Sequence, residues 1–329
     1  MRRECDISII TINYNGLKDT CELIDCLLCE DGRSMECGDC LSFEIIVVDN
    51  GSACHEAETI AGRYPTVRVI ANKANLGFAE ANNIGMREAC GRYLMLLNND
   101  TVVNILELKA LADRLEAKNN IGAVCPKIRF YPQQENNEQE RNTACSPLKG
   151  SAPGHGEIQF AGFTPFSKIT LRNRGIGYGE ADQGQYDLAH PTPYLHGAAM
   201  MVKREAVERA GMMPTCYFLY YEETEWSVTL RRAGYELWYE PRCTVFHKES
   251  RTTGRQSPLK TYYTTRNRML FAWRNLPPLE RMLSILYQTL AVVTRDCLRH
   301  LLHRRTDLAK ASLQGAYDFL VKHSTGPQQ

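Results

Sequence analysis

The sequence lacks a surplus of charge of either sign. Lys and Arg total 39, Asp and Glu total 38, and the formal net charge is +1. A dedicated nucleic-acid binder would show a basic excess. We therefore expect a protein that has no nucleic acid among its partners.

A long hydrophobic run is also missing. The longest apolar stretch near the C-terminus, residues 283–293, is interrupted by Gln288 and has about half of the length that a bilayer requires. At the N-terminus, Arg2 and Arg3 precede only a few apolar residues, which is unlike a secretory signal peptide. We expect a cytoplasmic protein whose 13 cysteines, an odd number, are reduced thiols.

What is present is an alternation of strand and helix patterns in the first hundred residues of a 329-residue chain. The predicted elements cover residues 7–12, 17–28, 44–48, 67–70, 79–90 and 93–97. Continuous apolar strands separated by helices predict an α/β fold, with a mostly parallel sheet and helices on both faces. A ligand site is expected at the carboxyl ends of the strands, where Asn13, Asp49 and Asp100 follow apolar runs.

The chain is expected to divide near residue 250. A segment rich in Gln, Asn, Glu and Pro, residues 131–153, predicts an exposed excursion. After residues 251–254 the sequence becomes helical in pattern and stays so to about Lys322. We predict an α/β domain over residues 1–250 and a C-terminal helical extension over residues 251–329.

Two carboxylates follow strands directly. An Asp in this position is by itself typical of a helix N-cap or a turn. Asp49 and Asp100 occupy it on two neighbouring predicted strands, so both would face one crevice. A carboxylate there can accept a hydrogen bond from a base or ribose, or hold a divalent cation against a diphosphate.

Three more carboxylates, Glu222, Glu223 and Glu225, follow the aromatic run 217–221. One explanation is a first helical turn, where acidic side chains favour the helix dipole. The other is that burial beside aromatic rings raises the pKa of a carboxylate and makes it a better general base. His247 ends a short strand-like run, and a lone histidine of this kind is more often structural.

These residues resemble the ordered signatures of family 2 glycosyltransferases, above all of the bacterial rhamnosyltransferase-like branch. The similar segments are residues 7–15, 46–52, 75–83, 96–101, 196–204 and the acidic run at Glu222, and they span about residues 5–270. The resemblance implies the Rossmann-like GT-A fold. It also implies inverting, metal-dependent transfer of a sugar from a nucleotide-diphosphate donor.

The resemblance implies donor-binding roles for several residues. Asp49 matches the residue that reads the base edge, and Thr11 and Asn13 match residues that line the nucleoside. The loop that closes beneath the donor is matched by Asn75, Gly77, Phe78, Asn82 and Asn83.

The metal site is implied by a second match. Asn98-Asn99-Asp100 stands at the position of the family's DXD-like motif, so Asp100 is the implied ligand of Mg²⁺ or Mn²⁺. Asn98 and Asn99 would contribute carbonyl oxygens or ribose contacts. His247 matches a position that helps to hold the metal or the diphosphate.

Glu223 matches the catalytic base of an acidic pair, which is Glu222-Glu223 here and Glu-Asp in the family. The assignment among Glu222, Glu223 and Glu225 stays open. Relatives commonly carry an Arg in the following helix where this chain has Thr229.

The branch that the chain resembles implies dTDP-rhamnose as the donor and a saccharide or lipid-linked acceptor, at the inner face of a bacterial membrane. Two alternatives stay open. A sugar-phosphate nucleotidyltransferase would need a basic, Gly-rich loop, whereas residues 11–18 hold one Gly and one Lys. An inactive nucleotide-sugar-binding module is kept open by the Asn98-Asn99 substitutions.

Two features lie outside this resemblance. Cys26, Cys29, Cys37 and Cys40 have a spacing that suits a structural zinc site, although four ordinary reduced thiols explain them as well. Residues 280–305 form an amphipathic helical pattern with a basic side. A helix packed on the first domain or on the second subunit of a homodimer is the favoured explanation. Peripheral contact with an anionic membrane is the other.

Overall fold

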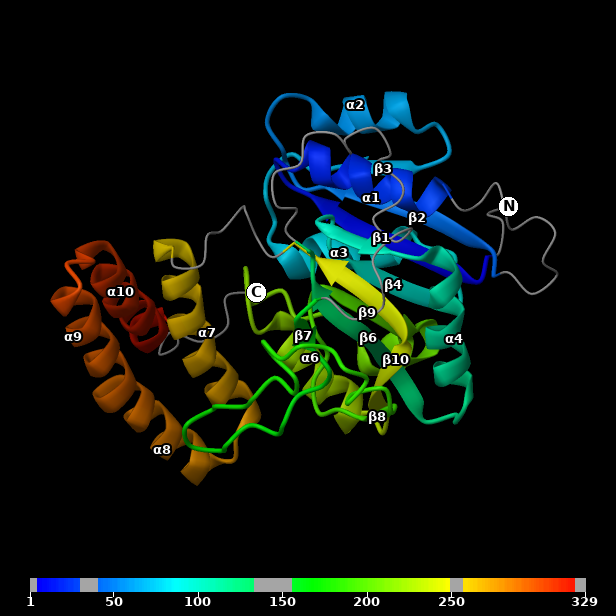
Figure 1. Ribbon diagram of the computed structural model, residues 1–329. Coiled ribbons are helices and arrows are strands. Elements are labelled where there is room, and N and C mark those ends of the chain that lie inside the picture. The colour runs from blue at the N-terminus through cyan, green and yellow to red at the C-terminus, as the bar shows by residue number, and fades with distance from the viewer. Residues whose placement is uncertain (1–4, 30–40, 133–155, 249–256, 323–329) are drawn as a thin grey trace.

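The computed structural model describes residues 5–29, 41–132, 156–248 and 257–322 (Figure 1). Most of the predicted excursion, from residue 133 on, therefore lies outside the described residues. The elements are, in chain order, β1 (Ile7–Asn13), α1 (Leu17–Cys29), β2 (Phe43–Asp49), α2 (Glu56–Arg63), β3 (Arg68–Ala71), α3 (Phe78–Glu88), β4 (Tyr93–Leu97), β5 (Thr101–Val103), the 3-10 turn η2 (Ile105–Glu107), α4 (Leu108–Glu116), β6 (Ile121–Phe130), β7 (Ile158–Phe160), β8 (His190–Pro191), β9 (Ala199–Lys203), α5 (Arg204–Ala210), α6 (Glu222–Arg232), β10 (Glu236–His247), α7 (Pro258–Asn275), α8 (Pro278–Tyr287), the π-helix η4 (Gln288–Val293), α9 (Thr294–Leu302) and α10 (Thr306–Lys322).

The strands form one sheet in the order β3-β2-β1-β4-β9-β6-β10-β5, with β7 beside β6 and β8 beside β10. The pairs β2–β3, β1–β2 and β1–β4 are parallel, as predicted. The pair β6–β10, whose strands were not predicted, is parallel as well. The sheet is nevertheless mixed, because β9 runs antiparallel to both β4 and β6, and β5 runs antiparallel to β10. β9 lies between β4 and β6, in the middle of the sheet.

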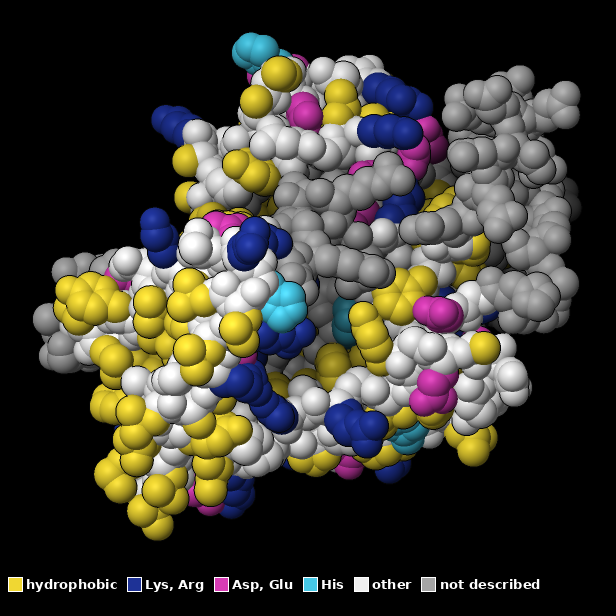
Figure 2. Space-filling view, turned by 60° about the vertical axis from the view of Figure 1, so that its left-hand side comes forward, with side chains coloured by type: hydrophobic (Ala, Val, Ile, Leu, Met, Phe, Trp, Pro, Cys, Tyr) yellow, Lys and Arg dark blue, Asp and Glu magenta, His cyan; other side chains and the backbone are white. Residues whose placement is uncertain are grey.

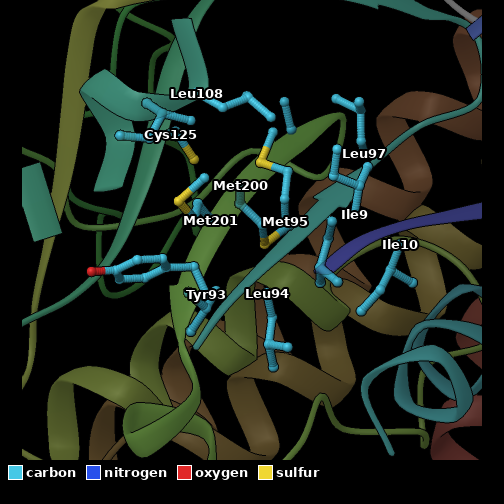
Figure 3. Close-up of a cluster of buried hydrophobic side chains, with 14 of the residues drawn as sticks. Ile9, Ile10, Tyr93, Leu94, Met95, Leu97, Leu108, Cys125, Met200 and Met201 are labelled. Carbon is cyan, nitrogen blue, oxygen red and sulfur yellow. The ribbon is translucent and has the colours of Figure 1, made fainter. Parts of the chain in front are cut away.

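The central strands are buried along their whole length. Every residue of β4 and β9 is buried, and since successive side chains of a strand point to opposite faces, both faces of the sheet are covered. Figure 3 shows this core, in which side chains of β1, β4 and β9 meet Leu108 of α4 and Cys125 of β6. Such a core gives rigid strands whose ends are held in fixed positions.

The C-terminal helices have a hydrophobic core of their own. Residues of α7, η4, α9 and α10 gather there around Met269 and Phe271. Leu171 and Tyr217, which precede these helices by many residues, belong to the same core and attach the helices to the rest of the molecule. In the part of the chain that the structure describes, no helix has the length and apolar character to cross a bilayer.

The tight packing of α3 on the sheet gives a test of the fold. A Cβ at Gly85 would lie 2.4 Å from Ile10 Cγ2, so Gly85→Ala should cost roughly 1–3 kcal/mol in overpacking, against a gain of about 1 kcal/mol in helix propensity. Gly62 of α2 faces open space, so Gly62→Ala should stabilise by about 0.4–1 kcal/mol. Thermal unfolding checks both variants. An increase in melting temperature for Gly85→Ala would contradict this packing.

Candidate functional site

The carboxyl ends of β1 and β2 are joined by a polar network. Asn13 and Asp49 are partners in the parallel register, and Asn13 Nδ2 donates to Asp49 Oδ1 at 2.6 Å and to Glu56 Oε2 at 2.8 Å. Thr20 Oγ1 donates to Asn13 Oδ1 at 2.7 Å, and Asn99 Nδ2 donates to Thr20 at 3.0 Å. The network therefore connects the ends of β1, β2 and β4, and it orients the buried Asp49 carboxylate at this edge of the sheet.

The loop before α3 is shaped by Asn50, a residue for which the sequence analysis proposed no role. Asn50 Nδ2 donates to Asn75 Oδ1 at 2.9 Å, and Asn75 Oδ1 also accepts from the backbone N–H of Gly77 at 2.9 Å. Gly77 has φ +84°, and a Cβ there would lie 2.5 Å from the carbonyl oxygen of Phe218. Only glycine fits this approach. The loop at Asn75 is thereby packed against the segment that leads into Glu222.

Asp100 and His247 lie together where β4 passes into β5 beside β10. His247 Nε2 is 3.2 Å from Asp100 Oδ1, and the His247 Nδ1 atom is 2.8 Å from Gln159 Oε1. An amide oxygen can only accept a hydrogen bond, so Nδ1 carries the hydrogen in the neutral ring. The other ring nitrogen, Nε2, is then a second acceptor that points at a carboxylate.

With the ring neutral, two acceptors face each other at this distance, and they repel each other unless a proton or a metal cation lies between them. His247 Nε2 is buried and makes no hydrogen bond within the described part of the chain. Carboxylate and imidazole are both metal ligands, and a metal-bound histidine typically donates its other N–H to a carbonyl or carboxylate, as His247 does to Gln159. The pair therefore fits a divalent cation. Gln159 was not predicted, because it is far from His247 in the sequence.

His196 and Gly197 lie between this pair and the acidic segment. The backbone N–H of Asn98 donates to the carbonyl of Ala198 at 2.9 Å, which places residues 196–198 beside the end of β4. Burial lowers the pKa of His196 to about 3, so its ring is neutral. A Cβ at Gly197 would lie 3.8 Å from Glu223 Cγ, so this backbone borders the Glu223 side chain.

The three carboxylates at the start of α6 have different environments. Glu225 is buried, and its carboxylate accepts hydrogen bonds from Arg274 Nε at 2.8 Å and from Asn275 Nδ2 at 2.9 Å. Glu222 is also buried, and burial raises its pKa well above the usual range, with the Glu223 charge adding to the effect. Burial raises the pKa of the partly exposed Glu223 as well.

Glu223 is therefore the acidic side chain of this turn that combines access to solvent with a raised pKa. A partly desolvated carboxylate of this kind is suited to accept a proton. The left-handed backbone at Tyr220 and Tyr221, with φ of +69° and +79°, turns the chain sharply into α6 just before it.

Several residues predicted to bind the donor are buried inside the protein. Thr11 is fully buried, and its Oγ1 has no hydrogen-bond partner in the described structure. Asn82 Nδ2 donates to the carbonyl of Phe78 at 3.1 Å, and Asn83 Nδ2 donates to the carbonyl of Met213 at 2.8 Å. The structure thus brings Asp49 and the residues after β4 to one edge. Thr11, Asn82 and Asn83 are buried beneath it, and so is Asn13, whose amide group bonds inside the protein.

The predicted zinc array cannot be assembled from the described residues, since Cys37 and Cys40 lie outside them and the array stays a prediction. Cys26 Sγ donates to the carbonyl of Val103 at 3.3 Å. A different group does come together. Cys5, Glu44 and Cys90 place potential ligand atoms within 4.8 Å of one another, at the amino ends of the parallel strands and away from Asp100.

Comparisons with known proteins show the family of the chain. The family model described as "Glycosyl transferase family 2" matches residues 8–211, and the chain belongs to that family. It is similar to the low-salt glycan biosynthesis hexosyltransferase Agl10 of Haloferax volcanii, with 23% identity over 80% of this chain and 75% of that protein. It is also similar to the N-acetylglucosaminyl-diphospho-decaprenol L-rhamnosyltransferase of Mycobacterium tuberculosis, with 24% identity over 64% of this chain and 68% of that one.

A solved structure supports the fold. The crystal structure of GalNAc-T7 with UDP, GalNAc and Mn²⁺ has a TM-score of 0.54 at 15% identity. The alignment covers 99% of this chain and 59% of that one, so this chain spans about three fifths of the length of GalNAc-T7. The architecture is the predicted GT-A fold.

Glu225 should prove structural when it is substituted. Glu225→Ala removes the acceptor of Tyr217, Arg274 and Asn275. It should lower the free energy of unfolding by about 1–3 kcal/mol, because the buried Tyr217 hydroxyl is left unsatisfied. Glu223→Gln is the matched control and should change the melting temperature little, since the Glu223 side chain is partly exposed. Thermal denaturation measures both. Equal melting temperatures for Glu225→Ala and the unsubstituted protein would rule this structural role out.

Proposed function

We propose that this member of family 2 is an inverting, metal-dependent glycosyltransferase that moves a sugar from a nucleotide-diphosphate donor to an acceptor hydroxyl. Residues 1–250 form its catalytic domain and residues 251–329 its helical extension. The observation that carries the proposal is the contact of two acceptors, Asp100 Oδ1 and His247 Nε2, 3.2 Å apart at the carboxyl edge of the sheet. The family membership supports it.

The donor nucleotide lies along this edge. Asp49, at the end of β2, accepts from the nucleoside, and Asn13, at the end of β1, holds the Asp49 carboxylate in place. Asn98 and Asn99 follow β4 and contact the ribose or the diphosphate. The loop at Asn75, held by Asn50 and by the close approach of Gly77 to Phe218, forms the floor beneath the donor.

Asp100 and His247 hold the divalent cation, Mg²⁺ or Mn²⁺. A cation held there would supply positive charge beside the leaving diphosphate. A unit charge pair about 4 Å apart is worth around 4 kcal/mol at an effective dielectric constant near 20, so a doubly charged ion contributes more than a single Lys would. Gln159 fixes the ring of His247 in the orientation that presents Nε2.

Glu223 is the general base. Its carboxylate takes the proton of the acceptor hydroxyl, and the acceptor oxygen attacks the anomeric carbon from the face opposite the leaving group. The bond from the anomeric carbon to the diphosphate oxygen breaks, and the nucleoside diphosphate leaves with the electron pair. Burial of Glu222 in its protonated form keeps a second negative charge away from Glu223.

The acceptor is a saccharide or a lipid-linked sugar of a surface polysaccharide, and the enzyme works in the cytoplasm at the inner face of the membrane. The printed activity of the Mycobacterium tuberculosis relative supports a rhamnosyl donor such as dTDP-rhamnose and a lipid-linked acceptor. The Haloferax volcanii relative is named as a hexosyltransferase of glycan biosynthesis, which supports the same class of product.

The donor site is tested by melting temperatures with UDP, GDP, dTDP, CDP or ADP, each with and without Mn²⁺. A ligand present at about 100 times its Kd stabilises the native state by roughly 2.7 kcal/mol. We expect one nucleotide to raise the melting temperature only with Mn²⁺. Asp100→Ala and His247→Ala should abolish that shift, and Asp113→Ala on the exposed side of α4 should keep it. A shift that is independent of metal, or unchanged in Asp100→Ala, would refute the metal assignment.

The base is tested by the pH dependence of transfer. Because burial raises the pKa of Glu223, the rate should fall as the pH drops through a value above the usual 4.5 of a glutamate. Glu223→Gln should lower kcat by about 10²–10⁴-fold and leave the nucleotide-induced shift intact. Glu205→Gln, at an exposed position of α5, is the control and should keep full activity. Unchanged turnover in Glu223→Gln would show that Glu223 is not the base. If the unsubstituted protein binds the donor but turns over no acceptor, it is an inactive binding module.

A further inference from the structure

The helical run α8–η4–α9 has an apolar outer face that the fold does not use. Its inner face is already docked, since Ser284 Oγ donates to the carbonyl of Ile169 at 2.8 Å and Gln288 Nε2 to that of Thr170 at 2.9 Å. The exposed large apolar side chains of the run are Leu279, Met282, Leu283, Leu286, Leu290, Leu298, Leu301 and Leu302. Figure 2 shows hydrophobic side chains gathered over the C-terminal helices.

A basic cavity adjoins this face. It has a volume of about 480 Å³ and lies between α7, α9 and the start of α10. Its basic and histidine side chains are Lys260, Arg299, His300, His303 and Arg305. Among the described residues no carboxylate lines it.

The charges of the cavity are only partly balanced. Arg305 is paired with Asp307, whose Oδ2 is 3.0 Å from its Nη2. Arg299 and His300 have no side-chain hydrogen bond or ion pair anywhere in the described structure. Among the described residues, the Lys260 side chain makes only a cation–π contact, with its Nζ 5.9 Å from the centre of the Tyr220 ring. Such a cavity suits a ligand with negative charge, and a phosphate accepts from Arg and Lys together.

The apolar face and the cavity lie on adjacent sides of one helix. In the sequence Leu298-Arg299-His300-Leu301-Leu302-His303, the leucines are three and four residues apart, and so are Arg299 and His303. Residues with this spacing share a side of a helix. A helix that presents leucines on one side and cations on the next is the pattern of a helix lying in a membrane interface. There the leucines enter the acyl region and the cations meet lipid phosphates.

We propose that α8, η4 and α9 dock on an anionic membrane surface and that the cavity of Lys260 and Arg299 binds the phosphate of a lipid headgroup. This deepens the proposed action at a membrane face, and it does not depend on the transfer chemistry. A second copy of the chain is the competing occupant. A two-fold contact through this face would bring two basic cavities together without a carboxylate in either, which is unfavourable.

Flotation of the full-length protein with vesicles tests the proposal. We expect binding to phosphatidylcholine vesicles that contain phosphatidylglycerol, weaker binding at high salt, and little binding to phosphatidylcholine alone. Leu302→Glu should lower the vesicle-bound fraction at least tenfold. Leu188→Glu is its matched control, because both leucines are 83% exposed and Leu188 lies away from the C-terminal helices. Since both positions are exposed, neither variant should change the melting temperature.

The cavity is tested separately. Lys260→Ala and Arg299→Ala should each weaken binding to the anionic vesicles about fivefold and reduce its salt dependence, since a basic residue at such a surface contributes about 1 kcal/mol. Lys118→Ala, an exposed change of equal charge, should have no effect. Sedimentation velocity without vesicles gives the oligomeric state, and transfer to a soluble acceptor gives the activity.

Absence of binding to anionic vesicles at low salt would overturn the docking proposal. A dimer in solution that Leu302→Glu dissociates would also overturn it and would assign the face to a second copy. Binding that is equal in Arg299→Ala and in the unsubstituted protein would overturn the phosphate site. If the transfer chemistry alone is wrong, vesicle binding persists while transfer to the soluble acceptor fails in every variant.

Discussion

The contact between Asp100 and His247 is the constraint around which the candidate site is organised. Asp100 Oδ1 and His247 Nε2 face each other at 3.2 Å, held there by the strands that carry them and by Gln159 behind the ring. A buried arrangement of two acceptors is unfavourable by itself and becomes favourable once a cation is bound. The fold keeps this arrangement because β5 and β10 are paired at Thr101 and His247.

The rest of the site follows from the same sheet. Parallel strands end at one edge, so the polar residues after β1, β2 and β4 come together although they are widely separated in the sequence. The buried core on both faces makes these ends rigid, and rigid positioning is what electrostatic catalysis requires. The antiparallel strand β9 then delivers His196 and Gly197 between the Asp100 pair and Glu223, which is the one acidic side chain of its turn with access to solvent.

The strands of the first hundred residues and the polar residues at their ends could be predicted from the sequence. Apolar runs that stop at Asn13, Asp49 and Asp100 give the strands and their polar ends directly. The long strands β6 and β10 were harder, because their pairing joins residues more than a hundred positions apart. For the same reason Gln159 was not found, since nothing in its neighbourhood shows that it meets His247. Buried amides such as Asn82 were assigned to the donor because a sequence does not show whether a polar side chain bonds to ligand or to backbone.

The central claim is that Asp100 and His247 bind the cation that accompanies the donor nucleotide. Anomalous diffraction from a crystal grown with Mn²⁺ and the nucleotide that stabilises the protein tests it most directly. The account predicts a manganese peak bonded to a carboxylate oxygen of Asp100 and to His247 Nε2, with the diphosphate beside it and the base near Asp49. A nucleotide bound at this edge with manganese elsewhere, or with no manganese peak at all, would contradict the account.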